Sequence, residues 1–131
     1  MALLDVQDLQ THFRTPDGGV NRAVDGLSFR VEAGETVAIV GESGCGKSAT
    51  ALAIIGLLPE GTAVGGAVRL AGTDLLGLSA EEMRRLRGGD VAMIFQEPMT
   101  SLNPAFTAGD QVAEAIRAHR AVPKRAAFDE A

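Results

Sequence analysis

The sequence predicts an α/β fold that begins with an antiparallel β unit. Two strand-like segments joined by a turn open the chain, and two short apolar runs further on read as buried strands. A helix-like segment follows the first of these runs directly. The chain has 131 residues, a formal net charge of −5, 46% hydrophobic and 22% charged side chains. This composition is typical of one globular domain, or of part of a larger one, with a buried core.

The first 31 residues predict a β-hairpin. Residues 3–13 read as a strand, and residues 15–19, Thr-Pro-Asp-Gly-Gly, have the composition of a tight turn. Residues 20–31 alternate through Leu27, Phe29 and Val31, which is the pattern of a half-buried strand.

Residues 36–40, Thr-Val-Ala-Ile-Val, and 91–95, Val-Ala-Met-Ile-Phe, predict two strands of a parallel sheet buried on both faces, since neither run alternates with polar residues. Residues 47–58 predict a helix that is apolar on every side and ends before Pro59. A further strand is expected at residues 67–71.

The last part of the chain predicts short helices around a loop. Ser79 and Glu82 have capping-box spacing and begin a helix that runs to Leu86. Residues 96–105 form a proline-punctuated loop.

An amphipathic helix is expected at residues 107–120, with Val112, Ala115 and Ile116 on one side. A polar, helix-prone segment follows Pro123.

Residues 41–48, Gly-Glu-Ser-Gly-Cys-Gly-Lys-Ser, fit the pattern G-x-x-x-x-G-K-[ST] between a predicted strand and a predicted helix. Glycines let the backbone curl so that N–H groups point at phosphate oxygens, and the helix N-terminus favours the same anion. Lys47 should reach the β- and γ-phosphates, and the Ser48 hydroxyl should ligate Mg²⁺. The alternative is a glycine-rich turn that binds nothing. The predicted ATP-binding residues are Gly41, Ser43, Gly44, Cys45, Gly46, Lys47, Ser48 and Ala49.

Gln96 and Glu97 follow the second buried run, where an acidic Mg²⁺ ligand and a catalytic Glu could stand. The first position is an amide, which is a weaker metal ligand than a carboxylate and cannot act as a base. Its carbonyl can still accept a Mg²⁺ contact, and its amide can order a water molecule. We therefore expect Gln96 to be a metal ligand and, with Lys47, a catalytic residue; the alternative is a polar residue at a strand end.

These two motifs resemble the Walker A motif and the Q-loop of ATP-binding cassette (ABC) proteins. Residues 95–107, Phe-Gln-Glu-Pro-Met-Thr-Ser-Leu-Asn-Pro-Ala-Phe-Thr, are similar to the Q-loop region of ATP-binding subunits of dipeptide and oligopeptide importers, whose close relatives carry nickel. The resemblance extends from residue 3 to about residue 120.

The resemblance implies an incomplete P-loop NTPase (RecA-like) core with an N-terminal antiparallel β subdomain and the start of an α-helical subdomain. The expected divisions are residues 1–35 for the β subdomain, 36–95 for the P-loop core with an inserted strand and helix, and 96–131 for the Q-loop and the start of the helical subdomain. Phe13 matches the aromatic residue that stacks on adenine in such proteins; the alternative is ordinary core packing.

The sequence also departs from the family pattern. It contains no Leu-Ser-Gly-Gly-Gln signature, no strand that ends in Asp-Glu (Walker B) and no switch histidine, since neither His12 nor His119 matches that position. These parts follow the Q-loop in the family, so the chain resembles roughly the first 40% of a subunit. We therefore expect it to bind Mg-ATP without hydrolysing it alone.

The resemblance implies an ATP-binding subunit that powers uptake of dipeptides or oligopeptides, and a transport ATPase as the full-length protein. It would be peripheral, at the cytoplasmic face of the cell membrane, with transmembrane permease subunits and a second ATP-binding subunit in a homo- or heterodimer. The alternatives are a soluble ABC-type ATPase of DNA repair or translation, or a non-catalytic nucleotide-binding fragment. The acidic balance argues against a nucleic-acid partner. The transported substrate stays open between dipeptide, oligopeptide and nickel.

Overall fold

A computed structural model describes residues 1–131, and the chain divides into two compact units, Met1–Met83 and Arg84–Ala131. The first unit contains an antiparallel sheet and the helix at residues 47–54, and the second contains the helices at residues 108–119 and 124–130; the helix at residues 80–86 crosses the boundary. This confirms an α/β fold that opens with antiparallel strands. None of the helices combines the length and the apolar composition that a membrane crossing requires.

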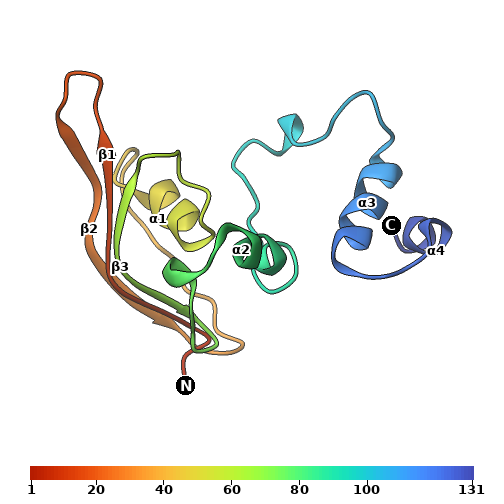
Figure 1. Cartoon of the computed structure of the whole chain (residues 1–131), viewed down its shortest axis with the longest axis horizontal. Helices are drawn as coiled ribbons and strands as arrows, with labels where there is room; N and C mark the ends of the chain where they lie inside the picture. The colour runs from red at the N-terminus through yellow and green to blue at the C-terminus, as the bar shows by residue number, and fades with distance from the viewer. The chain divides into compact units, whose positions relative to one another are not determined.

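The sheet of the first unit has the strand order β2-β1-β3-β4, and every pair is antiparallel. Its strands are β1 (Leu4–Arg14), β2 (Val20–Val31), β3 (Ala63–Leu70) and β4 (Thr73–Asp74). The predicted hairpin is confirmed, and its turn is closed by hydrogen bonds between Thr15 and Gly19 and between Gly18 and Thr15. β3 begins earlier than the sequence predicts and pairs with β1 (Figure 1).

An irregularity in β1 decides which of its side chains are buried. Asp8 has a φ of 47°, and the pairing register shifts between Val6 and Leu9. Beyond this bulge, alternation places Leu9, Thr11 and Phe13 on one face. Leu9 and Thr11 are fully buried there, whereas Phe13 is half-buried.

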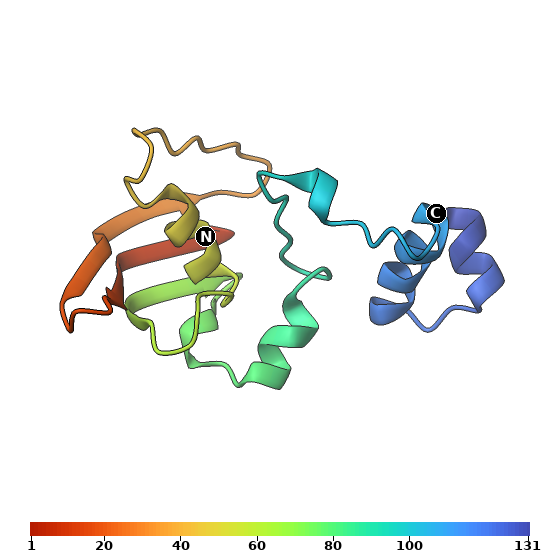
Figure 2. The same cartoon turned by 90° about the horizontal axis from the view of Figure 1, so that it is seen from above.

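Helix α1 (Lys47–Ile54) packs against β1 and β2 and completes the core of the first unit (Figures 1 and 2). It ends earlier than predicted because Gly56, with a φ of 63°, stops the helix before Pro59. The N–H of Gly56 donates to Ala53 and that of Leu57 donates to Leu52, the paired bonds of a Schellman C-cap. The buried apolar residues of this unit are Val6, Leu9, Val24, Ala53, Ile55, Val68, Leu75 and Met83.

Residues 36–40 do not form the predicted buried strand. No strand pairs with them, and Val37, Ile39 and Val40 are 39%, 43% and 87% exposed. A β-branched run becomes a parallel strand only where neighbouring strands satisfy its backbone and layers cover both faces. This chain provides no such neighbours, so the segment leads to α1 as an extended connection (Figure 2).

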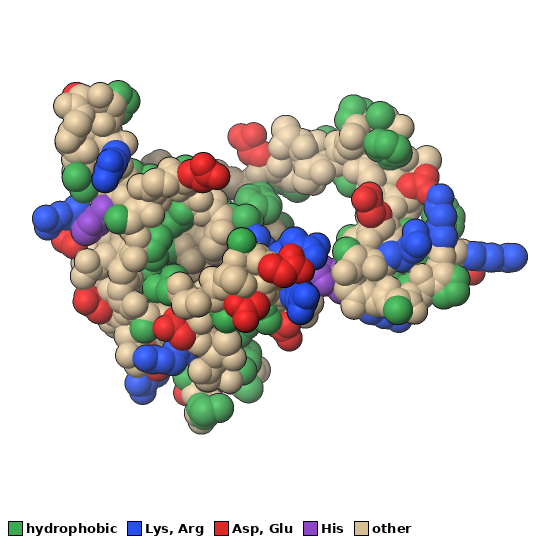
Figure 3. Space-filling view, viewed as in Figure 1, with side chains coloured by type: hydrophobic (Ala, Val, Ile, Leu, Met, Phe, Trp, Pro, Cys, Tyr) green, Lys and Arg blue, Asp and Glu red, His purple; other side chains and the backbone are tan.

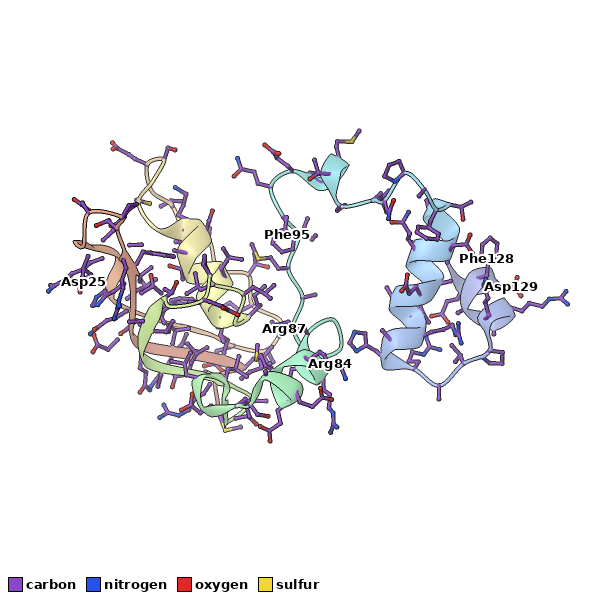
Figure 4. All side chains as sticks on the ribbon, turned by 45° about the horizontal axis from the view of Figure 1, so that its top comes forward. Asp25, Arg84, Arg87, Phe95, Phe128 and Asp129 are labelled. Carbon is purple, nitrogen blue, oxygen red and sulfur yellow. The ribbon has the colours of Figure 1, made fainter.

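The prediction of a buried strand at residues 91–95 is also wrong, for the same reason. The only β-bridge that this segment forms is an isolated parallel one between Val91 and Arg87. Ile94 is 93% exposed, and Phe95 is half exposed on an extended stretch (Figure 4).

Helix α2 (Ala80–Leu86) has the predicted capping box. The backbone N–H and the hydroxyl of Ser79 donate to Glu82 Oε2 at 2.8 and 2.7 Å, and the N–H of Glu82 donates back to Ser79 Oγ at 3.3 Å. Short 3₁₀ turns occur at Leu75–Gly77 and, inside the predicted loop, at Pro98–Thr100.

In the second unit, α3 (Ala108–His119) packs against α4 (Lys124–Glu130), and both agree with the predicted helical segments. Of the three apolar residues predicted on one side of α3, Val112 and Ala115 are exposed and Ile116 is half-buried. The buried residue of α3 is Ala113, because α4 packs against α3. The buried residue of α4 is Ala127. The Phe128 ring lies so close to Gly109 that a Cβ there would be 2.9 Å from it (Figure 4).

Candidate nucleotide-binding site

The loop that precedes α1 has the curled backbone expected of a phosphate loop. Gly44 and Gly46 have φ angles of 82° and 97°, in the left-handed region that favours glycine. The N–H of Cys45 donates to the carbonyl of Glu42 at 3.2 Å and closes a turn inside the loop. Gly46 is the N-cap of α1, so the curl leads directly into the first turn of the helix.

The side chain of Lys47 folds back over this loop. Its Nζ donates to the carbonyl oxygens of Gly41 and Glu42 at 2.6 and 2.7 Å, and lies 3.5 Å from Cys45 Sγ. The ammonium group is therefore held at the loop itself.

At Gly41 and Gly46, close approaches of neighbouring atoms also favour glycine. A Cβ at Gly41 would collide with the Cys45 sulfur, and one at Gly46 would collide with the carbonyl oxygen of Ala23 in β2. A side chain at position 41 would occupy the inside of the loop, and a side chain at position 46 would displace the loop from β2. At Gly44, by contrast, a Cβ would meet nothing within 4 Å.

The start of α1 supplies backbone donors at the same place. The N–H groups in the first turn of a helix have no carbonyl partner in the helix. Here they belong to Lys47, Ser48 and Ala49, because the N–H of Thr50 is the first to bond back, to the carbonyl of Gly46. The first turn carries no acidic side chain, and Gly46 supplies no side-chain cap. Free donors, a helix dipole and an adjacent ammonium group fit a phosphate group.

A cavity of about 310 Å³ lies beside the loop, between it, β2 and the segment before it. Its walls include Ala23, Val24, Ile39, Val40, Lys47 and Thr50. The loop end of the lining is polar and includes Lys47, which suits an anion, whereas β2 and residues 39–40 supply apolar side chains together with the carboxylate of Asp25.

The predicted loop residues lie together in the loop and the first turn of α1: Gly41, Ser43, Gly44, Cys45, Gly46, Lys47, Ser48 and Ala49. Phe13 lies near the end of β1 in the same unit, half-buried, and it does not line the cavity. Gln96 belongs to the second unit, just before the Pro98–Thr100 turn.

Of the two predicted metal ligands, Ser48 lies in the first unit and Gln96 in the second, and each side chain carries one oxygen of the kind that binds a cation. The chain has no group of three or more His, Cys, Asp or Glu side chains arranged to hold a metal. Oxygen ligands and water are what Mg²⁺ prefers, and it is commonly held by one or two protein oxygens together with phosphate oxygens. The Ser48 hydroxyl, in the first turn of α1, therefore fits Mg²⁺ that arrives with a nucleotide.

The structure adds residues that sequence reasoning misses, above all Thr50. Its hydroxyl donates to the carbonyl of Gly46 at 2.9 Å, and its side chain is 2% exposed. A threonine four positions after the last loop glycine, inside an apolar helix, is the signal that could have found it. Ala23 gives no such signal, because its part in the site is a backbone carbonyl from another strand.

Comparison with known proteins identifies the family of this chain. The family model described as "ABC transporter" matches residues 24–130. The oligopeptide transport ATP-binding protein OppD of Mycobacterium tuberculosis (strain H37Rv) is 56% identical over 126 residues, which cover 95% of this chain and 20% of that protein. The dipeptide transport ATP-binding protein DppD of Bacillus subtilis (strain 168) is 51% identical over 130 residues, which cover 98% of this chain and 38% of that protein.

OppD of Escherichia coli (strain K12) is 48% identical over 129 residues, again 98% of this chain and 38% of that protein. The chain thus spans between 20% and 38% of the length of these relatives. The family match covers most of the chain and includes the whole candidate loop. The chain belongs to the ABC transporter family.

Proposed function

We propose that this chain binds Mg-ATP at residues 41–48 and is the nucleotide-binding part of an ATP-binding subunit that powers peptide uptake. The observation that carries the proposal is the position of Lys47, whose ammonium group lies over a glycine loop that ends in the free N–H groups of α1. The printed names of the relatives, oligopeptide and dipeptide transport ATP-binding proteins, support the transport role and leave the two substrates open.

In this proposal Lys47 exchanges the carbonyl oxygens of Gly41 and Glu42 for oxygens of the β- and γ-phosphates. The first-turn N–H groups of α1 bind the same phosphates, and the Ser48 hydroxyl and Gln96 carbonyl serve as oxygen ligands. Mg²⁺, when bound, would neutralise phosphate charge that develops during transfer. Phe13 would supply a ring face for adenine.

The domain divisions at residues 1–35, 36–95 and 96–131 belong to the same proposal. The apolar runs at 36–40 and 91–95 would become strands where a longer protein supplies neighbouring strands. Support comes from their exposure, because Val40 is 87% and Ile94 is 93% exposed in this chain.

We also propose that the 131-residue chain binds ATP without turning it over, since it lacks the signature, the Asp-Glu strand and the switch histidine. The full-length protein would be a transport ATPase at the cytoplasmic face of the membrane, paired with a second ATP-binding subunit and with permease subunits. Acidic and basic side chains are interspersed on the face in Figure 3, so that face gives no support to a nucleic-acid partner.

Calorimetric titration of the chain with Mg-ATP tests the proposal. Lys47→Ala should weaken binding about tenfold to a hundredfold, because a charge-assisted bond to phosphate contributes roughly 1.5–3 kcal/mol. The matched control is Lys124→Ala, which removes the chain's other lysine, 75% exposed on α4, and should leave affinity unchanged. No binding by the unaltered chain, or equal affinities in all three proteins, would refute the proposal.

A further inference from the structure

Thr50 places two donors on one backbone carbonyl at the end of the loop. Its N–H and its hydroxyl both donate to the carbonyl oxygen of Gly46, each at 2.9 Å. Threonine hydroxyls in helices often bond the carbonyl four residues earlier. Here that carbonyl belongs to the N-cap residue, Gly46, which has a φ of 97°.

Gly46 is held in place from two directions, by β2 and by Thr50. Gly46 lies against the Ala23 carbonyl and Val24 of β2, so it cannot move toward the sheet. Thr50 is 2% exposed on the helix that packs on β1 and β2, so little of its side chain is accessible to solvent. The Gly46 carbonyl is therefore held against the helix by a buried donor.

Holding this carbonyl also sets the direction of a phosphate-facing donor. The Gly46 carbonyl and the Lys47 N–H belong to one planar trans peptide, in which the two bonds point in opposite directions. With the carbonyl turned into the helix, the Lys47 N–H must point out of it, toward the loop. We infer that Thr50 is a positioning residue, which aims the Lys47 N–H at the nucleotide phosphates; this inference rests on the proposed function.

The chain offers a matched control in Thr11. It is also fully buried, on β1, but its hydroxyl has no hydrogen-bond partner. Thr11→Val and Thr50→Val thus each remove a buried hydroxyl from the same unit, and only the second removes a bond to the loop.

The test measures Mg-ATP affinity of the 131-residue chain by calorimetry, with folding followed by circular dichroism. Thr50→Val should weaken binding about fivefold, the equivalent of one ordinary hydrogen bond, while Thr50→Ser stays within about twofold of the unaltered chain. Thr11→Val should leave affinity unchanged. In the absence of nucleotide, the amide resonance of Lys47 should shift in Thr50→Val and return in Thr50→Ser.

If Thr50→Val does not fold, Thr50→Ala is compared with Thr50→Ser, since both lack the methyl group and only serine keeps the hydroxyl. Equal affinity in those two variants, or in Thr50→Val and the unaltered chain, would overturn the positioning role alone. A loss in Thr50→Val that Thr50→Ser does not restore would also overturn it. If the unaltered chain did not bind Mg-ATP, the proposed function would fall together with this inference.

Discussion

The Nζ atom of Lys47 lies 2.6 Å from the carbonyl oxygen of Gly41. Gly41 is the first residue of the loop, and Lys47 lies near its end. A lysine beside a glycine loop could instead extend into solvent, where its charge is well hydrated. By bonding the loop, Lys47 ties the two ends of the phosphate-binding segment together. Phosphate oxygens carry more negative charge than carbonyl oxygens, so a nucleotide would compete effectively for the same ammonium group.

Gly46→Ala should destabilise the first unit more than Gly44→Ala. Both glycines have left-handed φ angles, which cost an alanine about 1–2 kcal/mol. At Gly46 the added Cβ also collides with the Ala23 carbonyl, whereas at Gly44 it meets nothing within 4 Å. We expect Gly46→Ala to lose about 3 kcal/mol or more, measured by urea denaturation. Equal losses in the two variants would contradict the close packing of Gly46 on β2.

Phe13→Ala should weaken ATP and GTP binding to a similar extent, because stacking distinguishes poorly between purines. Base–aromatic stacking contributes about 1–3 kcal/mol, so the expected loss is between about fivefold and a hundredfold. Phe13→Trp keeps a ring and should retain binding. His12→Ala, which alternation places on the opposite face of β1, is the control. Loss of fold without specific loss of nucleotide binding would favour core packing for Phe13.

The 131-residue chain should release no phosphate from ATP above the background of its Lys47→Ala variant. Positioned charges supply most of the rate in phosphoryl transfer, and the signature and the Asp-Glu carboxylate are missing from the sequence. A version extended through the complete gene is the positive control. Turnover by the short chain that Lys47→Ala abolishes would mean that Gln96 or Glu97 acts as the catalytic group.

The turn between β1 and β2 should respond to acid. A hydrogen bond from the Thr15 side chain, followed by the backbone N–H groups of Asp17 and Gly19, lowers the pKa of Asp17. A lowered pKa in the folded chain stabilises the turn above the ordinary aspartate value, and this contribution disappears as pH falls through the lowered one. Thr15→Val should raise the Asp17 pKa toward its ordinary value, measured by carboxyl NMR titration. An unchanged pKa would show that the hydroxyl is not the main cause.

The elements that the sequence predicts well are those whose causes are local. The hairpin follows from alternation and a Thr-Pro-Asp-Gly-Gly turn, and α2 follows from the spacing of Ser79 and Glu82. The loop before α1 follows from glycines at fixed positions, because Gly44 and Gly46 adopt backbone angles that other residues disfavour. Each cause acts within a few residues, so the pattern alone reveals it.

The elements that the sequence predicts wrongly depend on distant partners. The runs at residues 36–40 and 91–95 have the composition of buried strands, but composition does not supply the neighbouring strands. Likewise, the sequence of α3 does not reveal that Ala113 is its buried residue, because that depends on packing against α4. Ala23 joins the site only because α1 and its loop pack on the sheet, whereas Thr50 joins it through a local bond to Gly46.

Chemical-shift mapping of the 131-residue chain during titration with Mg-ATP tests most directly whether the loop is a nucleotide site. The account predicts the largest amide shifts at residues 41–49, smaller ones near Phe13, and neither in the Lys47→Ala variant at the same nucleotide concentration. Saturating shifts confined to other parts of the chain, such as α3 and α4, would contradict it, as would a loop whose resonances do not respond to the nucleotide.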